Sequence, residues 1–132
     1  MDKAITEINV WSEKEDYVFD FERLKVYDKS LEFIHAIFSL VKDLPREYQF
    51  SLGDQLKRAA LSIVNNIAEG SGKVSQKEKS QFYRISLNSA RECIPMLTIM
   101  AKENLINNSD QISLRKECIY ICNMLGKLIA SV

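Results

Sequence analysis

The sequence is poor in the residues that most catalytic sites use. Its 132 residues include one histidine, four glycines and two prolines. It has no glycine-rich phosphate loop, no HExxH zinc motif and no nucleophile motif. The single histidine, His35, lies between two apolar rows of an expected helix, where a lone histidine is more often a boundary residue than a general base. We therefore expect that the protein is not an enzyme and that it uses no cofactor and no small-molecule substrate.

Cysteine is also scarce, and its count is odd. Cys93, Cys118 and Cys122 occur in a chain whose first residues lack the apolar stretch of a signal peptide, so a disulfide framework is not expected. Cys118 and Cys122 are four residues apart on an expected helix and could share a metal with Cys93 and His35. Small buried apolar residues are the commoner role. We expect reduced core cysteines and no metal site.

Long apolar runs are missing as well. No run approaches the roughly 20 residues that a membrane-spanning helix requires. We expect no membrane association and a cytoplasmic location.

The net charge of zero hides an uneven distribution. Residues 1–20 carry six acidic and two basic side chains, which gives −4, whereas residues 21–132 carry 16 basic and 12 acidic side chains, which gives +4. An acidic N-terminal arm, residues 1–20, therefore precedes a mildly basic domain, residues 21–132. A surplus of four is small for a nucleic-acid binder, so the clustering of the basic residues must decide.

The apolar residues that are present follow the three-and-four spacing of amphipathic helices. Four helices are expected: Leu24 to Leu44, Ser51 to Gly70, Ser75 to Met100, and a last helix from the turn at Asn107–Asp110 to near the C-terminus. The residues that mark the last helix are Ile112, Arg115, Cys118, Ile119, Cys122, Leu125 and Ile129. No strand is expected, and short connections favour antiparallel neighbours. The sequence predicts an all-α fold, an antiparallel up-and-down four-helix bundle.

Local signals mark several helix ends. Ser51 is expected as an N-cap, and Gly70 as a left-handed residue that closes its helix. Ser75 and Glu78 form a capping box that opens the third helix. Glu69 lies in the last turn of its helix, where the helix dipole disfavours a negative charge, so we expect it to have a basic or amide partner.

The third helix has more apolar surface than one bundle seam needs. Apolar residues cover more than half of its circumference: Phe82, Tyr83, Ile85, Leu87, Ala90, Cys93, Ile94, Leu97 and Met100. This helix is either buried more deeply within one subunit, or it packs both in its own bundle and against another copy. We favour the second explanation, because each helix of a monomeric bundle normally has a polar outer face.

One group of residues points to a binding function. Basic residues recur at heptad spacing along the third helix, with others in the first half of the second helix and in the turn after it, and such a row can follow a phosphate backbone. The candidate nucleic-acid-binding residues are Lys57, Arg58, Lys73, Lys77, Arg84 and Arg91. A solvated polar face explains such residues about as often, and Tyr83, expected on the buried side, offers no aromatic platform for bases.

The sequence resembles a known bacterial family. The segment from Gln55 to Gly70, QLKRAALSIVNNIAEG, followed by SQKE at 75–78 and by Phe82, is similar to the four-helix bundle family associated with 23S rRNA intervening sequences. FERLKVY at 21–27 and NMLGKLI at 123–129 extend the resemblance over nearly all of residues 21–132.

The resemblance implies a ring-like homo-oligomer, a pentamer, with no known catalytic residues. Relatives that accompany the reverse transcriptases of diversity-generating retroelements resemble basic pentameric barrels that bind nucleic acid and the polymerase. This chain differs in being neutral overall and in carrying an acidic extension. Our leading hypothesis is a self-assembling helical adaptor whose basic face contacts RNA or a ribonucleoprotein. The alternative is a protein-interaction scaffold with no nucleic-acid role.

Overall fold

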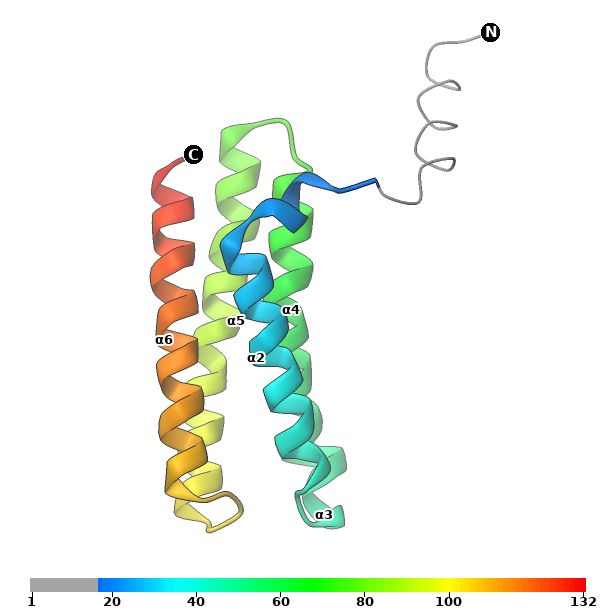
Figure 1. The fold of residues 1–132 in the computed structure, drawn as a ribbon, viewed down its shortest axis with the longest axis vertical. Coiled ribbons are helices and arrows are strands. Elements are labelled where there is room, and N and C mark those ends of the chain that lie inside the picture. Colours follow the sequence, from blue (N-terminus) through cyan, green and yellow to red (C-terminus); the bar gives the residue numbers. More distant parts are fainter. Residues whose placement is uncertain (1–16) are drawn as a thin grey trace, which may run out of the picture.

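Long helices form where the apolar spacing predicts them. The computed structural model describes residues 17–132, and Figure 1 shows its long helices side by side. These helices are α2 (Lys25–Lys42), α4 (Asp54–Ser71), α5 (Gln76–Lys102) and α6 (Asn108–Ala130). The shorter elements are the 3-10 turn η1 (Asp20–Arg23), the helical turn α3 (Arg46–Tyr48) and the π-helical turn η2 (Gln49–Gly53). No strand occurs within the described range.

Successive long helices run in opposite directions. α4 packs on α5 and α5 on α6, and α2 closes the bundle by packing on both α4 and α6. Because the chain reverses at each connection, the C-terminal end of α6 lies at the same end of the bundle as the start of α2 (Figure 1). The prediction of an all-α, antiparallel up-and-down four-helix bundle is confirmed.

Large apolar side chains from all four helices form the core. Eleven of them are essentially inaccessible to solvent: Phe33, Ile37, Leu56, Ile63, Ile67, Cys93, Leu97, Met100, Cys118, Ile121 and Leu125. Two serines fasten α5 to α4, since Ser86 Oγ donates to the Ile63 carbonyl at 2.8 Å and Ser89 Oγ lies 2.7 Å from Ser62 Oγ. The tightest helix pair of the bundle is therefore joined by apolar packing and by satisfied buried hydroxyls.

Three of the local signals hold in the structure, one of them in part. Ser75 Oγ accepts a hydrogen bond from the Glu78 amide at 3.0 Å, so this serine caps α5 as predicted. The reciprocal half of the capping box does not form, because the Glu78 carboxylate accepts from the Ser75 hydroxyl at 3.3 Å and not from the Ser75 amide. The Asn107 side chain caps α6 in the same way, by accepting from the Asp110 amide at 2.7 Å. Glu69 has the expected basic partner, because Lys73 Nζ lies 3.8 Å from its carboxylate.

Two of the local signals were wrong. Ser51 is no N-cap: the chain is already helical from Arg46, and α4 starts at Asp54 directly after η2. Gly70 does not adopt the left-handed conformation, since the described glycines all have negative φ and α4 continues to Ser71. Gly70 is buried instead against Tyr83 of α5, so this glycine allows close packing and does not end the helix.

The wide apolar surface of the third expected helix is divided in the structure. Tyr83, Leu97 and Met100 are buried, but Ile85 and Ile99 of α5 are nearly half exposed in the single chain. The excess of apolar surface that the sequence indicates is thus present outside the bundle core. Within the described range, no helix combines the length and the apolar character needed to cross a membrane. Most of the expected acidic arm, residues 1–16, lies outside the described residues.

Candidate nucleic-acid interface

A row of basic side chains follows the outer surface of α5. Lys77, Arg84 and Arg91 are all exposed and are seven residues apart. Since seven residues make almost two helical turns, the three lie on one line, with successive Cα atoms separated by about 10 Å along the axis. Lys102 continues this line three turns after Arg91 and is also exposed. The heptad-spaced row that the sequence predicts is therefore present on a continuous helix.

The row borders α6, which adds a further arginine to it. Arg91 lies close enough to Cys122 of α6 for its charge to act on that thiol, and Arg115 of α6 lies beside Cys118, whose pKa is raised by its hydrogen bond with Cys122 and by burial. The two arginines therefore flank the contact between α5 and α6. Arg115, which the sequence spacing groups with Cys118 and Cys122, has an exposed side chain beside the buried Cys118.

We use the name α5–α6 face for the exposed side chains on the side where these helices meet. Five of them are basic and two are isoleucines. The members are Lys77, Arg84, Arg91, Lys102, Ile112, Arg115 and Ile119.

The acidic residues of these two helices lie on other sides of the bundle. On α5, Glu78 and Glu92 are rotated about 100° from the basic row, toward the side that packs on α4. On α6, Asp110 and Glu117 face α2. The α5–α6 face therefore carries five positive charges and no carboxylate from either helix, which makes it a favourable surface for a polyanion.

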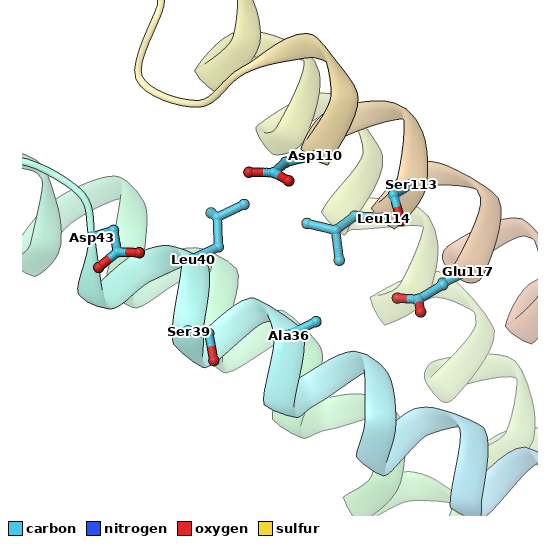
Figure 2. A pocket seen from close by; sticks show the side chains of 8 residues that line it. All are labelled: Ala36, Ser39, Leu40, Asp43, Asp110, Ser113, Leu114 and Glu117. Atoms are coloured by element: carbon cyan, nitrogen blue, oxygen red, sulfur yellow. The ribbon is translucent and has the colours of Figure 1, made fainter.

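Between α2 and α6 the charge has the opposite sign. A hollow of about 310 Å³ separates these helices, and Figure 2 shows Asp43, Asp110 and Glu117 around its rim, with Leu40 and Leu114 pointing toward each other across it. The other residues that line it are Ala36, Ser39 and Ser113. An anionic ligand would be repelled here, so the bundle presents differently charged faces.

The remaining candidate residues do not join the α5–α6 face. Lys57 points toward α2, with its Nζ 5.6 Å from the centre of the Phe38 ring and 3.6 Å from Asp54 Oδ1. Arg58 is exposed on α4, one residue further round the helix. Lys73 lies between α4 and α5 and is shared between Glu69 and the Phe82 ring, whose centre is 5.0 Å away. The structure thus brings Lys77, Arg84 and Arg91 together and separates Lys57, Arg58 and Lys73 from them.

All three cysteines are free thiols, and they lie where α5 meets α6. Cys93 and Cys118 are buried and donate to backbone carbonyls, Cys118 Sγ to Ala90 at 3.0 Å. The hydrogen bond with Cys118 lowers the pKa of Cys122, and the positive charge of Arg91 acts in the same direction. Burial raises the pKa of the Cys93 thiol to about 12. Cys122, which is half-buried, is therefore the most reactive of the three thiols.

The single histidine lies on the surface of the bundle. His35 is exposed on α2 beside a hollow of about 410 Å³ that is lined mainly by residues from α2, η2 and the start of α4. Within residues 17–132, no three histidine, cysteine or carboxylate side chains are grouped so that they could hold a metal ion.

Comparison with known proteins identifies the family. The family model described as 23S rRNA-intervening sequence protein matches residues 22–127. The chain belongs to this family. The matched range covers α2, α4 and α5 and most of α6, and it includes the whole α5–α6 face.

One solved structure of a family protein has a closely similar fold. It is the crystal structure of a protein of unknown function from the S23 ribosomal protein family of Bacteroides thetaiotaomicron VPI-5482. The TM-score is 0.75 at 29% sequence identity, and the match covers 80% of this chain and 95% of that one. No curated protein matches the chain.

Proposed function

We propose that the protein is a non-catalytic, self-assembling adaptor that binds RNA or a ribonucleoprotein through the α5–α6 face. The observation that carries the proposal is the gathering of five basic side chains, with no carboxylate, along one side of the bundle. The family's name refers to an intervening sequence of 23S rRNA, which favours RNA over other polyanions. We also propose a cytoplasmic location, which fits three unpaired thiols and a ribosomal RNA partner.

The spacing of the basic row suits contact with a phosphate backbone. From Lys77 to Arg91 the row spans about 21 Å of helix, and each guanidinium can bind phosphate oxygens through two parallel hydrogen bonds. Such contacts release counterions and are insensitive to base sequence. Ile112 and Ile119 provide no aromatic surface for stacking. We therefore expect binding that depends on salt and on RNA shape more than on sequence.

Charge reversal tests this proposal. The double variant Arg84→Glu/Arg91→Glu should weaken binding of a labelled structured RNA by at least about tenfold, and it should lower the slope of log K against log salt by about two. The matched control is Lys25→Glu/Lys29→Glu, which reverses two exposed lysines of α2 at the opposite corner of the bundle. RNA binding that is unchanged in the first variant, or equally weakened in both, would reject the α5–α6 face as the interface.

For self-assembly we propose a ring, a pentamer as the family resemblance implies. A closed ring with more than two subunits needs two different surfaces on each subunit. Two apolar strips lie on neighbouring sides of the bundle: Leu31, Phe38 and Leu61 over α2 and α4, and Ile85 with Ile99 on α5. These five side chains are between 39% and 49% exposed in the single chain. Pairing one strip with the other leaves the α5–α6 face open.

Light scattering tests the assembly. Leu61→Glu and Ile85→Glu each place a charge in one of the two strips, so either change should yield a monomer that keeps its helical circular dichroism. Val74→Glu is the control, because Val74 is 97% exposed and lies in neither strip. A wild-type chain that is monomeric at micromolar concentration, or assembly that survives both substitutions, would contradict the proposed ring.

The protein-interaction scaffold is the second candidate. Phe50, which is 75% exposed, borders the hollow that Phe38 and Lys57 also line, and an exposed aromatic side chain beside a hollow is typical of a protein-binding surface. Isolation of the chain with one protein partner, in an association that resists nuclease and is lost in Phe50→Ala, would favour this function over RNA binding.

A further inference from the structure

The acidic arm and the α5–α6 face have opposite charges. Residues 1–16 carry five acidic side chains, Asp2, Glu7, Glu13, Glu15 and Asp16, and two lysines, which gives −3. The α5–α6 face carries five positive charges and no carboxylate from its two helices. The other side that α6 shares in the bundle, its hollow with α2, is rimmed by three carboxylates and would repel the arm.

The arm is attached at the end of the bundle where the basic row starts. Tyr17 lies by Ala68 and Gly72, at the end of the bundle where α4 finishes and α5 begins. Lys77, the first residue of the basic row, is in the first turn of α5 at this same end (Figure 1). Glu13, Glu15 and Asp16 are the arm residues next to this point in the chain. The chain leaves the bundle beside α4, on the side away from α6 (Figure 1), so the arm must cross this end of the bundle to reach the basic row.

The arm is long enough to follow the row. Sixteen extended residues reach at most about 55 Å, whereas the row from Lys77 to Arg91 spans about 21 Å and the whole of α5 about 40 Å. The arm contains four larger apolar residues, Ile5, Ile8, Val10 and Trp11. The α5–α6 face offers Ile112 and Ile119, which are 49% and 44% exposed. Both the charge and the apolar character of the two segments therefore match.

We propose that residues 1–16 dock on the α5–α6 face of their own chain and compete there with RNA. The docking itself requires only the charges and the tether, whereas the competition rests on the proposed RNA-binding function. The arm is then an internal polyanion that occupies the α5–α6 face until a more highly charged ligand displaces it. If the arm occupies the face for nine-tenths of the time, the apparent Kd for RNA is about tenfold higher than that of the uncovered face.

Trp11 permits a test of docking that does not involve RNA. It is the only tryptophan in the chain and it belongs to the arm. In the wild type, acrylamide should quench Trp11 less at about 50 mM KCl than at about 1 M KCl, because salt screens the contact. This difference should be lost in Arg84→Glu/Arg91→Glu and in Glu13→Gln/Glu15→Gln/Asp16→Asn, and it should persist in Lys25→Glu/Lys29→Glu. Equal quenching at both salt concentrations in the wild type, or a difference that survives both sets of variants, would overturn the proposal.

Measurements on diluted protein distinguish docking of the arm within its own chain from docking on a neighbouring copy. Docking within one chain predicts the same quenching difference at every protein concentration, including concentrations at which light scattering shows dissociated subunits. A difference that disappears on dissociation would overturn docking within the chain.

RNA binding tests the competition separately. Deletion of residues 2–16 should increase RNA affinity about tenfold at low salt, and it should have no effect in the Arg84→Glu/Arg91→Glu background. Unchanged affinity in the deletion variant overturns the competition. If neither the full chain nor the deletion variant binds RNA while Trp11 responds to salt as described, the proposed function fails and the docking stands.

Discussion

Gly70 of α4 lies so close to the ring of Tyr83 of α5 that a Cβ atom on the glycine would be 2.8 Å from Tyr83 Cε1. Tyr83 is 3% exposed, and its phenol is held between the two helices where they approach most closely at this end of the bundle. The ring cannot move aside without leaving the core.

Gly70→Ala should therefore destabilise the fold. The added methyl group must displace a buried aromatic ring, which typically costs about 1–3 kcal/mol of unfolding free energy. Gly126→Ala is the matched control, because Gly126 is an exposed glycine within α6 and nothing lies within 4 Å of a Cβ built on it. The control should gain up to about 1 kcal/mol from helix propensity. Urea unfolding at fixed protein concentration measures both changes, and a Gly70→Ala variant as stable as the wild type would refute the close approach.

The hydrogen bond by which Ser75 caps α5 leads to a second prediction about stability. Its hydroxyl satisfies the Glu78 amide at the start of α5, so Ser75→Ala should lower the unfolding free energy by about 1 kcal/mol, whereas Ser75→Asp should retain most of it. Ser109→Ala, which changes an exposed serine in the first turn of α6, should have little effect. Similar losses in Ser75→Ala and Ser109→Ala would contradict the assigned role of the cap.

Removal of the hydroxyl group from two buried serines should change the unfolding free energy in opposite directions. Ser30 is fully buried in α2, and its Oγ has no hydrogen-bond partner among the described residues. Ser30→Ala should therefore raise the unfolding free energy, by about 1 kcal/mol. Ser86 is equally buried but donates to the Ile63 carbonyl, so Ser86→Ala should lower it by about the same amount. The comparison of the two midpoints in urea is the measurement, and a loss of stability in both variants would show that Ser30 has a polar partner.

Alkylation should follow the ionisation of Cys122. The hydrogen bond with Cys118 and the charge of Arg91 lower the pKa of Cys122 to about 7, so its reaction with iodoacetamide should rise through this pH and level off above it. Because Arg91 stabilises the thiolate, Arg91→Leu should raise the pKa and slow the reaction at neutral pH. Intact mass should show a single adduct, since Cys93 and Cys118 are buried. In urea, the pH at which alkylation reaches half of its maximal rate should return to about 8.5, the pKa of an unperturbed thiol. A half-maximal pH of about 8.5 in the native protein would contradict the lowered pKa of Cys122.

The sequence predicts those parts of the fold that depend on local interactions. The caps at Ser75 and Asn107 involve residues three positions apart, so the pattern alone locates the starts of α5 and α6. Gly70 and Ser51 were misinterpreted because packing decides their roles. The ring of Tyr83 requires a residue without a side chain at position 70, and the continuous helical corner at 46–53 leaves no free amide for Ser51 to cap.

The candidate interface was predictable to a similar extent. Heptad spacing places Lys77, Arg84 and Arg91 on one line, because they belong to one helix. The periodicity of α6 cannot show that Arg115 completes the same surface, since this depends on which side of α6 meets α5. For the same reason, the sequence does not separate the row from Lys57, Arg58 and Lys73. Their positions relative to α2 and to Phe82 became known only from the packing.

The placement of basic residues along α5 and of carboxylates between α2 and α6 gives this neutral chain an uneven charge distribution across the bundle. A molecule without net charge lacks the long-range attraction that a net positive charge would have toward a polyanion. It does experience a torque in the polyanion's field, which turns the positive side of the bundle toward the source before the two surfaces touch. Orientation in place of long-range attraction would favour encounters with dense, structured anions over the diffuse charge of the surrounding nucleic acid.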